Sequence, residues 1–478
     1  MMYGEEKSDS LIVAANLANN PQGAESVERR SGAKGNAEQP HMRRTQSRES
    51  MSQRLSRVRE AAKQRKKERF TALFHLLTAE ALENAFLSLS RKAAAGVDGV
   101  RWKDYAENLK VNIADLHRRL HQGSYRAQPG RRHYIPKADG KQRPLGIASL
   151  EDKIVQYALV KILNAVYEND FMGFSYGFRP GRSQHNALDA LATGLVRTNV
   201  NWVLDADISQ FFDKVSHEWL IRFIEHRIGD QRVIRLIRKW LTAGTSEEGE
   251  WRASEEGTPQ GAVISPLLAN IYLHYVFDLW AHQWRRRHAT GNVVMVRYAD
   301  DIVIGFDKRI DAQCFRIAMQ RRLKEFGLTV HPKKTRLMEF GRFAAENRAS
   351  RGKGKPETFN FLGFTHISGK DRSGRFMLIR KTRRDRMTAT LKAIKDGLRK
   401  RWHYSIPEQG KWLRRVVQGY LNYHSVPGNY PMMRKFRIYV TDLWRRALRR
   451  RSQQDDTTWT KANRLAAVWL PKVRVLHP

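Results

Sequence analysis

Two adjacent carboxylates stand between two short hydrophobic segments near the middle of the chain. Asp300 and Asp301 follow Tyr298, and they separate residues 293–296 from residues 302–304, which are rich in valine and isoleucine. Two β-branched runs joined by so few residues predict a β-hairpin with both carboxylates at its tip. Neighbouring carboxylates repel each other unless a cation neutralises them. The pair therefore indicates either a metal site or a surface hairpin with two solvated aspartates.

A second acidic segment favours the metal site. Residues 202–204 are hydrophobic and lead into Asp205 and Asp207, so a strand is predicted to end in carboxylates. Enzymes that join nucleotides hold two Mg²⁺ ions roughly 4 Å apart, and carboxylates from separate strands bind them. Asp207, Asp300 and Asp301 would supply such a set.

These segments resemble the reverse transcriptases encoded by bacterial group II introns. The sequence that runs from Asp207 and Ile208 to Phe211, Phe212 and Asp213 is similar to the first metal-binding motif of that family, and residues 298–301 are similar to its YxDD motif. The resemblance implies an α+β, right-hand polymerase with fingers, a palm built on an antiparallel sheet, and an all-α basic thumb or maturase domain.

The same resemblance assigns the metal ligands. It implies that Asp207 and Asp300 bridge two Mg²⁺ ions, that Asp301 assists, and that the backbone carbonyl of Ile208 is a further ligand. The other two carboxylates of the segment, Asp205 and Asp213, are expected to form local hydrogen bonds instead.

Other segments match the family in the same order along the chain. Residues 92–100 are similar to its first fingers motif, and residues 134–145 read as a strand, an Asp-Gly turn and a return strand. The resemblance places Lys137 and Arg143 of that hairpin on the triphosphate of the incoming dNTP, and it places Lys334 near the leaving pyrophosphate. A solvated basic hairpin is the alternative.

The pocket for the deoxynucleotide is expected to include Phe212 and Gln260. Phe212 lies five residues after Asp207, where the family keeps a bulky side chain against the sugar, and the competing interpretation is a buried core phenylalanine. Phe211 fits that core role better. Gln260 lies in a Gly/Pro turn at residues 257–261 that enters a predicted helix.

Nucleic-acid contacts are expected from Arg179, Arg182 and Tyr298. Residues 178–183 open a predicted helix with Ser183 as its cap, and a helix N-terminus can bind a phosphate. The two arginines could instead be structural ion-pair partners. A later aromatic segment, residues 359–364, is similar to the strands that grip the primer.

The charge of the chain points to polyanionic partners. It carries 87 Lys and Arg against 48 Asp and Glu, a formal net charge of +39. A field of that sign attracts nucleic acid. No run of about 18 apolar residues and no signal peptide are found, so we expect no membrane partner and a cytoplasmic, nucleoid-associated protein. Cys314 is the single cysteine, which excludes an intrachain disulfide.

Composition divides the chain into three parts. Residues 1–66 are polar and basic and predict a disordered extension, although residues 54–69 could form a helix that overlaps its end. Residues 67–370 alternate helical and strand-like patterns and predict the fingers and palm. Residues 371–478 hold 27 Lys and Arg but only 7 Asp and Glu, and their apolar residues have helical spacing. They predict a helical, RNA-binding thumb or maturase domain.

The resemblance implies an RNA-directed DNA polymerase that also binds its intron RNA as a ribonucleoprotein and assists splicing and retrohoming. Its partners would be the intron RNA, an RNA template, a DNA primer or target, and dNTPs. We expect no HNH endonuclease, because the chain stops at Pro478 and has one cysteine. Two alternatives remain: a domesticated reverse transcriptase serving defence, repair or diversity generation, and a maturase that acts only by binding RNA.

Overall fold

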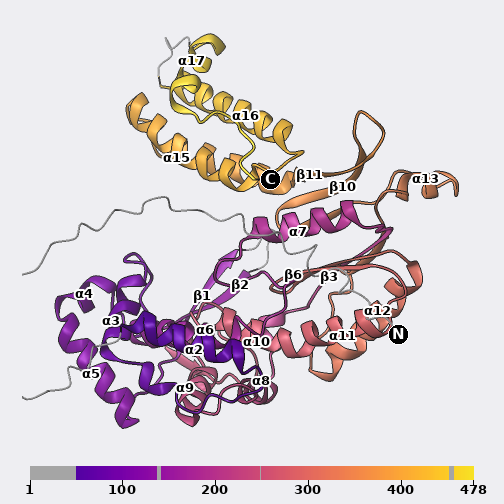
Figure 1. Ribbon diagram of the computed structural model, residues 1–478. Helices are drawn as coiled ribbons and strands as arrows, with labels where there is room; N and C mark the ends of the chain where they lie inside the picture. Colours follow the sequence, from indigo (N-terminus) through magenta and orange to yellow (C-terminus); the bar gives the residue numbers. More distant parts are fainter. Residues whose placement is uncertain (1–49, 137–141, 248, 452–456, 478) are drawn as a thin grey trace, which may run out of the picture.

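The computed structural model describes residues 50–136, 142–247, 249–451 and 457–477, which form an α+β protein as predicted (Figure 1). The helices of the first third of the chain and the C-terminal helices lie at opposite ends, and an antiparallel sheet lies between them. Across these described ranges, no helix combines the length and the apolar composition that a membrane span needs.

The central sheet carries the predicted acidic strands. It has four antiparallel strands in the order β6-β7-β3-β8, namely β3 (Trp202–Asp207), β6 (Val293–Tyr298), β7 (Asp301–Phe306) and β8 (Arg336–Glu339). Its apolar side chains alternate between two buried clusters, one containing Val203 and Val303 and the other containing Leu204 and Ile304. This alternation confirms the predicted strands and the predicted hairpin of β6 and β7.

Helices cover both faces of this sheet. Helix α7 (Gln184–Arg197) packs on the face of Val203, where Gly194 meets Val294. The other face contacts a larger core. Its helices are α8 (His217–Glu225), α9 (Gln231–Thr242), α10 (Ser265–Leu273), α11 (Leu279–Arg287) and α12 (Arg309–Glu325), together with the 3₁₀ turn η2 (Phe211–Asp213) and the π-helix η3 (His274–Asp278).

A helical unit precedes the central sheet, and a small second sheet combines strands from before and after β3. Helix α6 (Leu150–Tyr167) is buried on nearly every side, so it forms the axis of this unit. Around it lie η1 (Phe74–Leu76), α3 (Ala79–Ser88), α4 (Trp102–Glu107) and α5 (Leu109–Gln122). The small sheet has the order β2-β1-β4-β5, with β1 (Gly130–Pro136), β2 (Gln142–Ile147), β4 (Thr245–Glu247) and β5 (Glu250–Arg252). The predicted hairpin of residues 134–145 is thereby confirmed in its two strands.

The prediction of a disordered extension from residue 1 to residue 66 is wrong for residues 51–64, and the helix that was considered possible at residues 54–69 is present there in part. They form helix α2 (Met51–Gln64), which begins at a Ser50 capping box and packs against α6. Ala62 is completely buried, and the buried Arg227 side chain donates to the carbonyls of Ala62 and Arg65. Burial of one helix face and these bonds to the helix end outweigh the polar composition of the segment. Residues 1–49 lie outside the described residues.

The C-terminal part begins later than predicted. The boundary at residue 371 falls in the turn between β10 (Phe364–Lys370) and β11 (Phe376–Thr382), which pair with β9 (Phe359–Phe361) in a sheet of order β11-β10-β9. The helical part starts at Arg384 and contains α14 (Arg384–Arg399), α15 (Ile406–His424), α16 (Tyr430–Arg449) and α17 (Trp459–Trp469) around its own core. A short helix, α13 (Ala344–Ala349), lies between β8 and β9.

Candidate active site

The β6–β7 hairpin holds two carboxylates in a tight turn. Tyr298 pairs with Asp301 at the end of the ladder, which leaves Ala299 and Asp300 as the turn residues. Ala299 has a positive φ of 57°, a conformation that lets the chain reverse in so few residues. The predicted position of Asp300 and Asp301 at the tip of a hairpin is confirmed.

The two acidic segments meet across neighbouring strands. Asp207, the last residue of β3, is the direct partner of Asp301, the first residue of β7. Directly opposed residues in an antiparallel pair have Cβ atoms roughly 5 Å apart on one face. Asp205 lies two residues before Asp207, so its side chain is on the same face. Residues 94 positions apart therefore form one acidic cluster with Asp300 beside it.

Burial and mutual repulsion raise the pKa of several of these carboxyls. Burial is the main cause for Asp205, whose pKa rises to about 7. The pKa of Asp301 rises to about 6, first through burial and then through the charges of Asp300 and Asp207. The pKa of Asp300 is raised by burial and by Asp207, while the charges of Arg143 and Lys334 act in the opposite direction. The cluster is therefore electrostatically unfavourable as an assembly of anions.

One cation already contacts the cluster. The ammonium of Lys334 lies 2.9 Å from Oδ2 of Asp207, and the Lys334 side chain remains largely exposed. Its loop is fixed because the His331 amide donates to the Asp207 carbonyl at 2.7 Å and Ser209 donates to Thr329 at 2.8 Å. Lys334 thus lies beside the acidic cluster.

The donor set suits a hard cation. Carboxylate oxygens are the ligands that Mg²⁺ prefers, and burial of mutually repelling carboxylates is offset when a cation binds. Within the described ranges, however, no three His, Cys, Asp or Glu side chains are arranged to hold a metal ion. Lys334 is the counter-ion of Asp207 instead. The residues fit the ion chemically.

The two phenylalanines after Asp207 have different environments. Phe211 is buried in the core, as the sequence predicted, and Phe212 is partly exposed. The ring of Phe212 lies edge-on to that of Phe178, 6.5 Å between centroids, and Phe178 is also 6.5 Å from Tyr298. Phe178 has a positive φ of 59°, an unusual conformation for a bulky residue. An aromatic group therefore borders the acidic cluster.

The Gly/Pro turn closes another side of the same region. Gln260 donates to Oδ1 of Asp213 at 2.8 Å, which confirms the local hydrogen bond predicted for Asp213. The Thr258 amide donates to the Phe212 carbonyl at 2.7 Å. Gly257 has a φ of 85°, and a Cβ there would lie 2.9 Å from that same carbonyl, so only glycine fits without a shift. The corresponding prediction for Asp205 is not met, since no hydrogen bond from a described residue reaches its carboxylate.

Strand β2 brings a further cation to this region. The Gly146 amide donates to the Gln260 carbonyl at 2.6 Å, which joins the small sheet to the turn. Arg143, on the same strand, is exposed and close enough for its charge to lower the pKa of Asp300. Lys137 lies outside the described residues.

The arginines of residues 178–183 are structural in this protein. Arg179 is buried, and its guanidinium donates to the Glu168 carboxylate and to the carbonyls of Met172 and Ser175. Arg182 donates to the Gly173 carbonyl at 2.5 Å. The ion-pair alternative holds for Arg179, which pairs with Glu168, whereas Arg182 donates only to backbone carbonyls, so both arginines hold the chain segment that precedes them. Ser183 caps α7 as predicted.

Sequence reasoning missed the support beneath the hairpin. Arg297 is completely buried and donates to both carboxylate oxygens of Asp278, to Asn270, to Ser175 and to the carbonyl of Ala299. Arg297 directly follows the hydrophobic residues 293–296, and a charged side chain next to a buried strand must be paired. This position in the sequence could have predicted a buried ion pair for Arg297. Its partner could not have been found, because Asp278 ends a π-helix that no sequence pattern predicted.

Comparison with known proteins identifies the class. Residues 135–366 match the family model of reverse transcriptase, described as RNA-dependent DNA polymerase. This segment includes the acidic cluster, the Gly/Pro turn and Lys334. The chain thus carries a reverse transcriptase domain.

The similar proteins narrow the class. Protein YkfC of Escherichia coli (strain K12) is 43% identical over 206 residues, 42% of this chain and 54% of that protein. The group II intron-encoded protein LtrA of Lactococcus lactis subsp. cremoris is 37% identical over 223 residues, 46% of this chain and 37% of LtrA. The mitochondrial nuclear intron maturase 2 of Arabidopsis thaliana is 29% identical over 110 residues, 22% of this chain and 15% of that protein. The matched part of the chain spans about half the length of YkfC and a smaller share of the other two proteins. The chain is related to the reverse transcriptases and maturases of group II introns.

Proposed function

We propose that this chain is an RNA-directed DNA polymerase that works with two Mg²⁺ ions. The observation that carries the proposal is the direct opposition of Asp207 and Asp301 on adjacent strands, with Asp300 in the neighbouring turn. Burial and mutual repulsion raise the pKa of Asp300 and Asp301, so three carboxylates this close together are unfavourable without cations. A polymerase with two metal ions requires such a group of carboxylates.

Asp207, Asp300, Asp301 and the backbone carbonyl of Ile208 would hold the two ions. When bound, the ions would activate the primer 3′-hydroxyl and stabilise the leaving pyrophosphate. Lys334 would release Asp207 and turn its ammonium toward the pyrophosphate, which its long exposed side chain permits.

The remaining site residues would bind the incoming dNTP. Arg143 and Lys137 would contact the triphosphate from the β1–β2 hairpin, where the forked guanidinium and the flexible ammonium suit phosphate oxygens. The partly exposed face of Phe212 would lie against the sugar and collide with a 2′-hydroxyl. Gln260, fixed by Asp213, would border the base pair, and Tyr298 would contact the primer or template.

The architecture fits a right hand. The sheet of β3, β6, β7 and β8 would be the palm, the helices α2–α6 with the β1–β2 hairpin would be the fingers, and α14–α17 would be the thumb. The sheet of β9–β11 would grip the primer between palm and thumb. The thumb would also bind intron RNA and assist splicing, since exposed Arg and Lys side chains on helices suit phosphates and 2′-hydroxyls.

Asp300→Ala separates the two roles. We expect the variant to lose extension of a DNA primer on an RNA template with dNTPs and Mg²⁺, while it retains the affinity of the native chain for the same RNA. RNA affinity is measured by filter binding without dNTPs. Loss of both properties in a variant with native thermal stability would contradict a two-role protein.

A further inference from the structure

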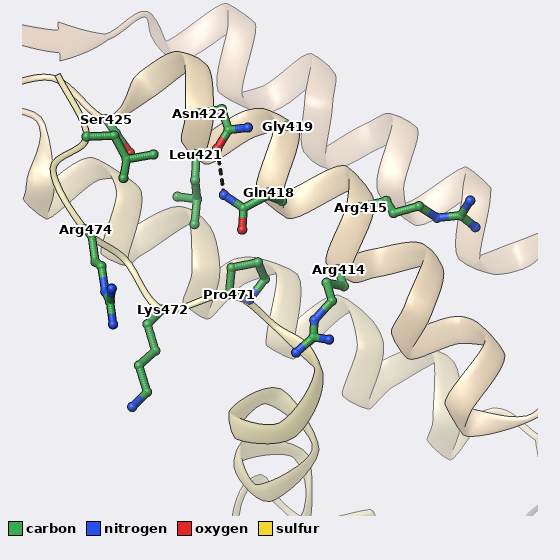
Figure 2. A pocket seen from close by; sticks show the side chains of 11 residues that line it. Arg414, Arg415, Gln418, Gly419, Leu421, Asn422, Ser425, Pro471, Lys472 and Arg474 are labelled. Carbon is green, nitrogen blue, oxygen red and sulfur yellow. Dashed lines mark hydrogen bonds between the residues drawn. The ribbon is translucent and has the colours of Figure 1, made fainter. Parts of the chain in front are cut away.

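A basic cleft lies in the C-terminal helical part, away from the acidic cluster. Helix α15 forms one wall and residues 471–477, here called the C-terminal segment, form the other (Figure 2). The volume of the cleft is about 820 Å³. It is open along one side, so a short stretch of nucleic-acid backbone can enter it.

The charge of the cleft is of one sign. Arg414 from α15 and Lys472 and Arg474 from the C-terminal segment extend to the same side, whereas Arg415 points away from that segment (Figure 2). Of the described residues that line the cleft, none is acidic, and none of these three cations forms an ion pair with another described residue. Cations gathered without counter-ions repel one another and attract a polyanion.

Gly419 supplies an independent observation. It lies inside α15, and glycine is among the least favourable residues of a helix interior. The other helical glycines have a packing reason, because a Cβ on Gly194, Gly397 or Gly410 would lie 2.4–2.5 Å from a neighbouring side chain. A Cβ on Gly419 would meet nothing within 4 Å. The glycine therefore leaves open space in the cleft where a ligand can approach the helix backbone.

The second wall is held in place by bonds at both of its ends. Arg437 donates to the Pro471 carbonyl at 3.1 Å, and the amides of Leu476 and His477 donate to the Ser425 carbonyl. The imidazole of His477 stacks on that of His185 in α7, with centroids 3.5 Å apart. The cleft is thus preformed, which lowers the entropy cost of binding.

We propose that this cleft binds the ribose-phosphate backbone of RNA, an inference that rests on the RNA-binding role proposed above. The cations pair with phosphates, and Gly419 admits the backbone to the helix surface. Gln418 and Asn422, which bond each other at 2.6 Å on the same helix face, offer amides for a 2′-hydroxyl. No aromatic residue lines the cleft among the described residues, so recognition uses the backbone and not stacked bases.

Gly419→Ala tests the cleft in the full chain. Alanine favours the helix, so we expect a melting temperature equal to or above the native value. Binding of a short fluorescein-labelled RNA hairpin, measured by anisotropy without Mg²⁺ or dNTPs, should weaken about tenfold because the methyl group fills the space beside the backbone. An unchanged affinity, or a lower melting temperature, would overturn the assignment.

A second variant tests the phosphate contacts. Arg474→Gln should reduce the slope of log affinity against log salt by about one, as expected for loss of one phosphate contact. Arg235→Gln removes the same charge from an exposed site on α9, outside the helices assigned to RNA binding, and should leave the slope nearly unchanged. Equal effects of the two variants would reduce the cleft to part of a general basic surface and overturn the proposal.

The choice of ligand is tested with two competitors. A DNA hairpin of the same sequence and poly-glutamate should each displace the labelled RNA only weakly. Gly419→Ala should not change how strongly either competitor displaces the RNA. Equal competition by DNA would overturn the assignment to RNA, and equal competition by poly-glutamate would indicate an acidic protein partner. Primer extension by the same variants on a pre-annealed template distinguishes the two proposals. If the variants extend the primer at the native rate but the RNA-binding predictions fail, the cleft assignment is wrong and the polymerase assignment is unaffected.

Discussion

Arg297 and Asp278, both completely buried, form a two-pronged ion pair beneath the turn that carries Asp300 and Asp301. The guanidinium donates to Oδ1 of Asp278 at 2.7 Å and to Oδ2 at 2.5 Å. Its remaining donors bind Asn270, Ser175 and the Ala299 carbonyl, so all five N–H groups of the arginine are used. The hairpin turn is thereby anchored to the π-helix below it. Asn270 extends the network by donating to the Gly177 carbonyl at 2.7 Å.

Arg297→Lys should disrupt this anchor although it keeps the charge. Lysine has three donors on a flexible side chain and cannot reproduce five bonds in a fixed plane. We expect a loss of about 3 kcal/mol in the free energy of unfolding, as for other broken buried pairs, and a lower rate of primer extension. Urea unfolding and steady-state extension measure the two effects. Arg309→Lys, at an arginine that lies over Trp202 on the surface, is the matched control and should cost less than about 1 kcal/mol. Similar losses in both variants would contradict the anchoring role.

Asp205 gives a pH dependence of defined sign. Burial raises its pKa to about 7, whereas an aspartate in an unfolded chain titrates near 4. The folded state binds this proton more tightly, so the stabilisation is present at low pH and is lost as the pH rises through about 7. Asparagine cannot ionise. In metal-free buffer Asp205→Asn should therefore melt at a higher temperature than the native chain at pH 8, and the difference should shrink toward pH 4. A difference independent of pH would show that Asp205 is paired or exposed in solution.

Phe212→Ala should weaken the discrimination against ribonucleotides. If the ring of Phe212 blocks a 2′-hydroxyl, its removal should lower the ratio of kcat/KM for dNTP over rNTP by about tenfold or more. Thermal stability should change little because Phe212 is partly exposed. Phe211→Ala is the informative contrast, since this buried side chain should cost about 3–5 kcal/mol of stability. An unchanged ratio in Phe212→Ala would remove the residue from the nucleotide pocket.

The elements that position the site were predictable to different degrees. The β6–β7 hairpin and strand β3 follow from β-branched runs that end in carboxylates, so the residue types and their spacing are enough to single out Asp207, Asp300 and Asp301. A helix was allowed for residues 54–69, but the start of α2 at Met51 and its packing were not predictable, because its polar sequence gives little hydrophobic signal and its burial depends on α6 and Arg227, which lie far along the chain.

Roles that depend on distant partners were the hardest to predict. Arg179 reads as a phosphate ligand in its segment, and only the fold brings Glu168 and two carbonyls around it. The network of Arg297 joins residues up to 122 positions apart through a π-helix. The ion pair of Lys334 with Asp207 also spans 127 positions. Local sequence patterns identify the chemistry of such residues but not their partners.

Single-nucleotide incorporation tests the central claim most directly. The native chain, Asp300→Asn and Asp307→Asn are each given a DNA primer on an RNA template with one dNTP and Mg²⁺. Asp307 follows β7 at the far end of the same hairpin, where it binds Asn292 and not the acidic cluster. We expect incorporation by the native chain and by Asp307→Asn, and a rate at least about 10³-fold lower for Asp300→Asn, because the metal-bound carboxylates contribute several kcal/mol to catalysis. Incorporation by Asp300→Asn at the native rate, or none by the native chain, would contradict the assignment of these carboxylates as a polymerase site.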